Sequence, residues 1–151
     1  MRGIRFLMSV FFLASFSLGC HSTAVISPNV GMMKSPNPLA TAVPVEVRRE
    51  KLVERLRDGG ALNSIRLVEV FKGAGNPNPY PEYRMFDIQQ GGVFDLLGIR
   101  NGDILVSAHG YSVPSVSKFV EYVNVLPGES SSQIEIIRQK RSLILSLAFT
   151  E

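Results

Sequence analysis

The chain is poor in the residue types that most catalytic and metal sites require. It holds one cysteine, two histidines and no tryptophan among 151 residues. The histidines, His21 and His109, are far apart, and neither stands at a spacing typical of a metal site or of a nucleophile and its base. No glycine-rich loop followed by Lys-Ser or Lys-Thr is present to hold phosphates. We therefore predict a protein that is not an enzyme, with no catalytic residue, metal ion or cofactor.

A strong excess of one charge is also missing. The chain has 16 basic and 13 acidic residues, a formal net charge of +3. Arg2 and Arg5, next to the N-terminus, account for two of these charges. The remaining basic and acidic residues are spread along the chain, so it lacks the positive field that nucleic-acid binding requires. Nucleic acid is not an expected partner.

The longest apolar run lies at the N-terminus. Residues 6–16 are almost all apolar, and Arg2 and Arg5 precede them, which is the pattern of an export signal. The run is about 11 residues long, whereas a membrane-spanning helix needs roughly 20. A cleaved signal peptide over residues 1–19 is therefore favoured over the alternative, an uncleaved signal anchor.

Cys20, the only cysteine, directly follows this signal. The residues before it, Ser17-Leu18-Gly19, resemble the lipobox of bacterial lipoproteins, although that family usually has Leu where Ser17 stands. The resemblance implies lipidation of Cys20 and attachment in the envelope of a Gram-negative bacterium, facing the periplasm. His21 rather than Asp follows the cysteine, which implies the outer membrane rather than the inner. The alternative is an incidental small residue, although a lone cysteine in an exported chain has no internal disulfide partner.

The composition changes after Cys20 and again near Val45. Residues 20–44 are rich in Ser, Pro, Asn, Thr and Ala without a period of 2 or 3.6, so we predict a flexible tether that is dispensable for folding. Residues 45–151 are expected to form one domain. At the start of this domain, apolar residues stand at helical spacing among charged ones, namely Val45, Leu52, Val53 and Leu56. This pattern predicts an amphipathic helix.

The rest of the domain alternates between strand and helix patterns. A capping serine, Ser115, starts a predicted helix over 115–126, and glycines bound a short helix over 91–98. Five apolar or alternating segments predict strands, over 65–71, 83–89, 102–108, 133–138 and 143–149. The expected fold class is α+β, a small β-barrel or sandwich of about five strands with two or three helices.

The segment from Gly92 to Gly110 is the most specific motif of the chain. A short apolar helix ends at Gly98, an Asn-Gly-Asp turn leads into an apolar strand, and a second turn at His109-Gly110 follows. This pattern resembles the signature of bacterial PDZ domains, except that His109 replaces the usual Asn. Asp103 is expected to bond local backbone amides, and Ile104 and Val106 to enter the core.

Within that class the chain is most similar to the PDZ domain of type II secretion system protein C. The resemblance covers residues 45–149 and includes an amphipathic helix, a strand over 65–70 and the segment Tyr83-Arg84-Met85-Phe86. The family has a transmembrane helix and a secretin-binding region before its PDZ domain, where this chain has a lipobox and a tether. The secretin-binding role is therefore not implied.

The mechanism implied by the resemblance is strand addition, in which an extended polypeptide pairs with a sheet edge. We expect the segment to lie between the 83–88 strand and the 115–126 helix, with Val116 and Val120 closing the pocket. Tyr83 and Met85 are its expected walls and Arg84 faces away, although Met85, Val116 and Val120 could equally be core. Glu82 stands where the family's carboxylate-binding loop has glycine, which predicts that internal segments bind better than free C-termini.

Two functions remain open from the sequence. The first is a membrane-anchored, non-catalytic interaction module in type II protein secretion, with protein or peptide segments of the cell envelope as partners. The alternative is an adaptor that recruits substrates to a Deg-type envelope protease or regulates it.

Overall fold

The computed structural model of the chain describes residues 33–34, 37–58, 65–71 and 80–151. These residues form an α+β fold with a single six-stranded sheet, which confirms the predicted fold class with one strand more than expected. The strands are β1 (Thr41–Arg48), β2 (Arg66–Val70), β3 (Glu82–Phe86), β4 (Ile104–Ala108), β5 (Ser131–Arg138) and β6 (Arg141–Thr150). The helices are α1 (Arg49–Arg57), α2 (Val93–Leu96) and α3 (Val116–Val125), and a 3-10 turn (Leu126–Gly128) follows α3.

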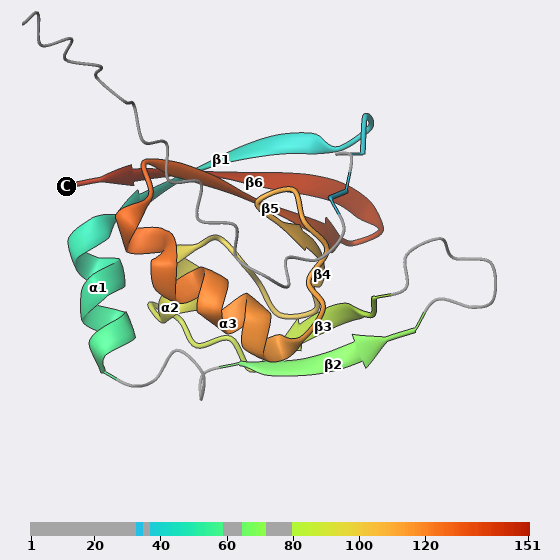
Figure 1. Ribbon diagram of the computed structural model, residues 1–151, viewed down its shortest axis with the longest axis horizontal. Coiled ribbons are helices and arrows are strands. Elements are labelled where there is room, and N and C mark those ends of the chain that lie inside the picture. The colour runs from blue at the N-terminus through green and yellow to red at the C-terminus, as the bar shows by residue number, and fades with distance from the viewer. Residues whose placement is uncertain (1–32, 35–36, 59–64, 72–79) are drawn as a thin grey trace, which may run out of the picture.

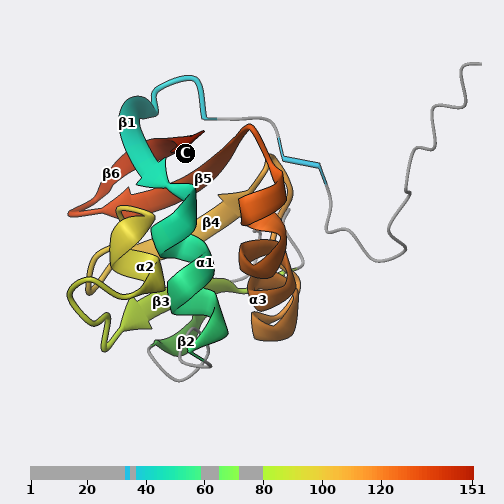
Figure 2. The same cartoon turned by 90° about the vertical axis from the view of Figure 1, so that its left-hand side faces the viewer.

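The sheet has the order β1-β6-β5-β4-β3-β2. Neighbouring strands from β2 to β6 are antiparallel, whereas β1 lies parallel to β6. The sheet is strongly curved, α3 lies across it, and α1 stands at one end beside α2 (Figures 1 and 2). The fold therefore leaves β1 and β2 at the two edges of the sheet.

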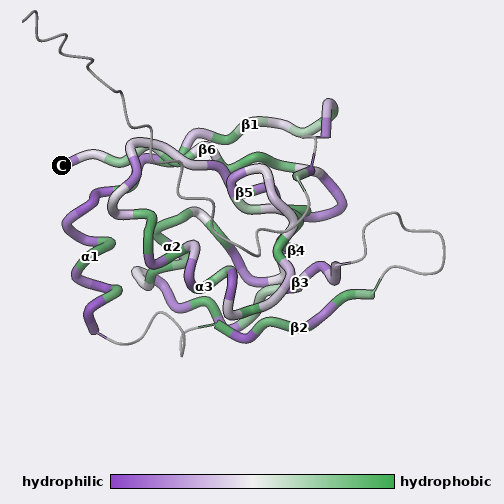
Figure 3. Tube along the Cα trace, in the orientation of Figure 1, coloured by the Kyte–Doolittle hydropathy of each residue, from purple (hydrophilic) through white to green (hydrophobic). Residues whose placement is uncertain are grey.

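The predicted helix from Val45 is wrong in its first turn. Residues 41–48 form strand β1, and α1 begins only at Arg49. Alternate β-branched residues, Val43, Val45 and Val47, face the core from this strand, and a period of 2 with β-branched side chains fits a strand better than a helix. The hydrophobic residues of α1 lie on its inner side (Figure 3), with Leu52 fully buried.

The predicted tether is also wrong at its C-terminal end. Residues 41–44 belong to β1, so the folded part begins before Val45. Further upstream, the Lys34 backbone N–H donates to the Gly110 carbonyl at 2.8 Å, and Met33 forms an isolated bridge with Tyr111. The other tether residues before 37, the signal peptide and Cys20 lie outside the described residues. No helix in the described ranges has the length and apolar character needed to cross a bilayer.

The core lies between the concave face of the sheet and the helices. Its aromatic centre is Phe119 of α3, whose ring stacks on Phe94 of α2 at 5.9 Å and on Tyr122 at 6.2 Å between centroids. Ser115 caps α3 as predicted, accepting a hydrogen bond from the Lys118 backbone N–H at 3.3 Å. The aromatic stack therefore fixes α3 against α2 and the sheet.

The turn after α2 has the predicted conformation. Gly98 has φ +77, and a Cβ there would approach a Val45 methyl group within 3.0 Å, so glycine is required both by conformation and by space. Asp103 accepts the Arg100 backbone N–H at 2.8 Å, as expected. The sequence did not reveal its second partner, Arg138 of β5. That guanidinium donates to both carboxylate oxygens of Asp103, at 2.8 and 2.7 Å, and to the Gly98 carbonyl at 2.7 Å.

Candidate functional site

The strand predicted to accept an added segment has no open edge. β3 pairs with β2 along its whole length on one side and with β4 on the other. Every position from Glu82 to Phe86 has a cross-strand partner in β2. An extended ligand cannot add to β3 in this structure, so the prediction of a site beside the 83–88 strand is wrong.

The four residues of β3 that were expected to surround the ligand therefore do not line a binding site there. Tyr83 and Met85 are buried in the core. For Met85 this was the alternative given by the sequence. Arg84 is exposed on the opposite face of the strand, as predicted. Glu82 is buried within β3, opposite Val70, and belongs to no loop. Glu82 is therefore not placed to repel a ligand's carboxylate, and the predicted preference for internal segments no longer follows from this residue.

The open edge next to β3 belongs to β2. Among the residues that the structure describes, no strand pairs with the outer side of β2, and β2 is the last strand in the sheet order. Its Leu67 packs against the core, while Val68 is 40% exposed and Phe71, just after the strand, is 77% exposed. An edge strand with exposed apolar side chains offers both backbone hydrogen-bond groups and apolar contacts to a further strand.

Helix α3 turns an apolar flank toward the β2 side of the sheet. On the other flank, Tyr122 hydrogen-bonds to Ser132 of β5 at 2.8 Å. Helical geometry places Val116 and Val120 about 120–160° around the axis from Tyr122, and the sheet order continues from β5 through β4 and β3 to β2. Val116 is 40% exposed and Val120 partly buried, so neither is an ordinary core residue. These two predicted site residues thus face away from β5, in the direction in which the sheet continues to β2.

Tyr83 connects this side of the sheet to the start of α3. Its hydroxyl donates to the Pro114 carbonyl at 3.3 Å, two residues before the helix begins. Burial raises the pKa of the Tyr83 hydroxyl, and the carboxylate of its cross-strand partner Glu69 raises it further. Because Tyr83 contacts Pro114 and lies opposite Glu69, the negative charge of Glu69 on β2 is near the N-terminal end of α3.

A second polar cluster involves the one histidine in the described part of the chain. His109, at φ +51 in the predicted turn, has Nδ1 3.0 Å from the Ser132 hydroxyl, which in turn contacts the Tyr122 hydroxyl at 2.8 Å. The Ser132 side chain is buried, so the cluster ties α3 and the turn to β5 and does not present a nucleophile to solvent. Within the described residues, no group of three or more metal-ligating side chains occurs. That the protein is not an enzyme stays a prediction.

The Tyr122 hydroxyl should make stability depend on pH in alkaline solution. Burial raises its pKa to about 12, the Ser132 hydrogen bond opposes this, and the Glu129 charge adds to it. The folded state therefore holds this proton more tightly than the unfolded state, whose tyrosine ionises near pH 10. The stabilisation that the Tyr122 hydroxyl contributes is fully present below pH 10. As the pH rises toward 12, the free energy of unfolding falls by up to about 2 kcal/mol.

Urea unfolding at pH 9, 10, 11 and 12 measures this loss, and Tyr122→Phe is the control because it cannot ionise. Over this range the free energy of unfolding should fall less steeply with pH in Tyr122→Phe than in the wild type. Equal slopes in both proteins would show that other groups cause the alkaline destabilisation.

Sequence reasoning missed β2 as the open edge, although the strand itself was predicted. The available signal was the pair Val68 and Val70, which puts apolar side chains on the face opposite to the one that Leu67 buries, followed directly by the apolar Phe71. The ion pair between Asp103 and Arg138 could not be predicted from the sequence, because these residues are 35 positions apart.

Comparisons with known proteins give structural similarity only. No family model matches the chain, and no curated protein matches it. Among solved structures, the PDZ domain of EpsC from Vibrio cholerae, residues 204–305, is 17% identical, with a TM-score of 0.38 and coverage of 67% of this chain and 98% of that one. The PDZ domain of pullulanase C of the type II secretion system from Klebsiella pneumoniae, in complex with fatty acid, is 16% identical, with a TM-score of 0.35 and coverage of 64% and 98%. Similarities this weak assign no function, so the site is defined by the geometry of this chain.

Proposed function

We propose that this chain is a non-catalytic interaction module of the cell envelope that binds extended polypeptide segments by strand addition. The acceptor is the outer edge of β2, and the added segment lies between this edge and the Val116–Val120 flank of α3. The observation that carries the proposal is the unpaired edge of β2 among the described residues, with exposed apolar side chains next to it. Main-chain hydrogen bonds supply affinity in this mode, and side-chain pockets supply specificity.

The other edge strand, β1, is a poorer acceptor. Its fourth residue, Pro44, has no backbone N–H, and proline in an edge strand places the missing donor on the outer side. β2 contains no proline, and its exposed Val68 offers an apolar contact. The two edges therefore differ in what they offer, and β2 is the one suited to pairing.

The cellular setting of this module comes from the sequence. We propose attachment to the membrane through a lipid on Cys20, in the envelope of a Gram-negative bacterium and facing the periplasm, with the outer membrane as its site. The sequence resemblance to type II secretion system protein C supports a role in type II protein secretion, with other envelope proteins as partners. The lipobox and the export signal support the anchor.

Substitution of Val116 tests the proposed ligand site. Val116→Asp places a charge where an apolar ligand side chain would pack, so peptide affinity should fall by a factor of about ten or more, which corresponds to losing roughly 1.5 kcal/mol of apolar contact. Stability should change little, because an acidic residue in the first turn of a helix is favourable. Peptides selected by the wild-type chain from a random ten-residue library serve as probes, and fluorescence polarisation gives the affinities.

The matched control lies on the same helix. Val125 is 59% exposed, and nine residues along the helix place it on the opposite side from Val116, so Val125→Asp should leave peptide binding unchanged. Amide hydrogen exchange of the bound state should show new protection in β2. Equal losses of affinity in both variants, or protection in β1 instead of β2, would contradict the proposed site.

A further inference from the structure

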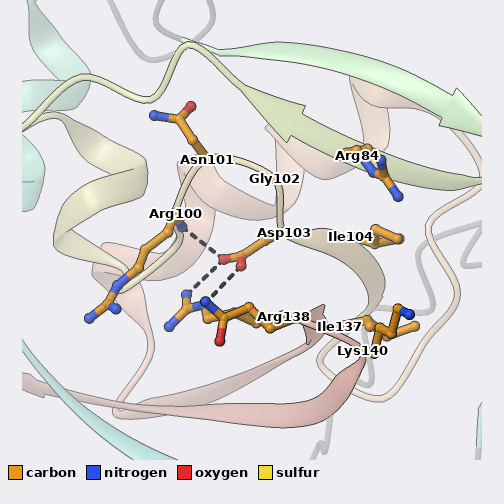
Figure 4. A pocket seen from close by; sticks show the side chains of 10 residues that line it. Arg84, Arg100, Asn101, Gly102, Asp103, Ile104, Ile137, Arg138 and Lys140 are labelled. Atoms are coloured by element: carbon orange, nitrogen blue, oxygen red, sulfur yellow. Dashed lines mark hydrogen bonds and ion pairs between the residues drawn. The ribbon is translucent and has the colours of Figure 1, made fainter.

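An open pocket lies on the outer side of the sheet, away from the α3 flank. It has a volume of about 430 Å³ and is formed by β3, by the turn before β4 and by the hairpin between β5 and β6. Arg84, Arg100 and Lys140 line it, and Figure 4 shows Arg84 and Lys140 on the side of Ile104 and Ile137, with Arg100 on the other side of Asp103. Cations from three separate segments thus line one depression.

The pocket keeps a net positive charge. Its single carboxylate, Asp103, is 1% exposed and already holds the Arg138 guanidinium and the Arg100 backbone N–H. Within the described residues, the side chains of Arg84, Arg100 and Lys140 have neither a hydrogen bond nor an ion pair. Three charges therefore stay uncompensated in a pocket whose fourth cation is neutralised. Such a site attracts an anion.

The floor between the cations is apolar. Ile104 and Ile137 are cross-strand neighbours, both only partly buried, and Ile104 is in turn opposite Arg84. On the far side of Arg84, Val68 occupies the same row across the sheet and is 40% exposed. A small inorganic anion would satisfy the cations and leave this apolar row exposed to water. A ligand with an anionic group next to an apolar body would satisfy both.

We propose that this pocket binds the phosphate group of an anionic phospholipid, so that this face of the domain docks on a bilayer. The cations contact the lipid phosphate, while Ile104, Ile137 and Val68 contact its glycerol and acyl portion. Each Lys or Arg near an anionic membrane surface contributes about 1 kcal/mol, which is about fivefold in affinity. Val68 also belongs to the proposed β2 acceptor edge, but the inference does not depend on strand addition there, because the cations Arg84, Arg100 and Lys140 carry it.

Amide hydrogen exchange of the full chain, reconstituted in vesicles, tests the proposal. In vesicles with phosphatidylglycerol, the turn at 100–103 and the hairpin at 138–141 should exchange at least fivefold more slowly than in phosphatidylcholine vesicles. The triple variant Arg84→Gln, Arg100→Gln, Lys140→Gln should lose this difference, since three substitutions weaken docking on the order of a hundredfold. Retained protection of β5 and β6 shows that the variant is folded.

A second triple variant controls for total charge. Arg48→Gln, Lys51→Gln and Arg57→Gln remove three exposed cations that do not line the pocket, and the protection should persist. The conservative variant Arg84→Lys, Arg100→Lys should also retain the protection. Loss of the protection in the control variant, or no difference between the two lipids in the wild type, would overturn the proposal. The same protection in phosphatidylcholine vesicles with soluble glycerol phosphate or a polyglutamate peptide would also overturn it, in favour of a soluble anion.

Discussion

A chain that begins at Arg49 will not fold, whereas a chain that begins at Asn37 will have nearly the wild-type stability. The first truncation removes β1, whose eight residues pair with β6 along their whole length. The buried Val47 and the partly buried Val43 and Val45 leave the core with it, and full burial of one valine contributes roughly 1.5–3 kcal/mol. Their sum approaches the 5–15 kcal/mol that stabilises a typical domain.

A chain that begins at Val45 separates the contributions within β1. It keeps Val45 and Val47 but loses the pairing of residues 41–44, so its free energy of unfolding should fall between those of the other two chains. Urea unfolding followed by far-ultraviolet circular dichroism measures all three. If the chains that begin at Asn37 and Val45 are equally stable, residues 41–44 contribute nothing, and the prediction of a dispensable segment up to residue 44 holds after all.

Asp103→Ala should lower the free energy of unfolding by about 3–5 kcal/mol. The side chain is 1% exposed, and its removal leaves the Arg138 guanidinium without its anion and the Arg100 backbone N–H without its acceptor. Breaking a buried pair by deleting one partner costs this much because the other charge stays buried without compensation. In the wild type the hydrogen bond to Asp103 raises the pKa of the Arg138 guanidinium. The variant lacks this bond, but an arginine side chain stays protonated in proteins in any case, so Arg138 cannot lose its charge to escape the penalty.

An exposed ion pair in the same sheet provides the comparison. Arg66 and Asp87 are 2.9 Å apart with both side chains more than half exposed, so Asp87→Ala should cost less than about 1 kcal/mol. The double variant Asp103→Leu, Arg138→Met should recover most of the stability, because it leaves no unpaired charge. A cost for Asp103→Ala as small as that for Asp87→Ala would show that water compensates Arg138.

The sequence predicted those features that neighbouring residues determine. Gly98 and His109 both have the expected left-handed conformation, and Ser115 caps α3, because each depends on a few adjacent residues. Five of the six strands were also recognised from their apolar patterns, with ends that differ by at most three residues. Local backbone preferences and hydrophobic periodicity are sufficient for such features.

Pairing between distant segments was not predictable in the same way. β1 lies beside β6, about 100 residues later, and nothing near Val45 in the sequence shows whether such a partner exists. The placement of the ligand site failed for the same reason, since Tyr83 and Met85 suit both a core strand and an edge strand. Only the sheet order shows that β2 covers β3, whereas the helix that carries Val116 and Val120 was predictable because α3 is defined by its own local sequence.

The parallel arrangement of β1 and β6 determines how the domain responds to mechanical force. Thr41 pairs with Leu143 and Arg48 with Thr150, so the chain enters the sheet at one end of β1 and the domain continues from the other end through α1. A pull on the chain ahead of Thr41, directed along the strand, loads the β1–β6 hydrogen bonds in shear and therefore all at once. Rupture then requires the whole strand to slide, which makes β1 a stronger mechanical attachment than a strand whose bonds open one by one from an end.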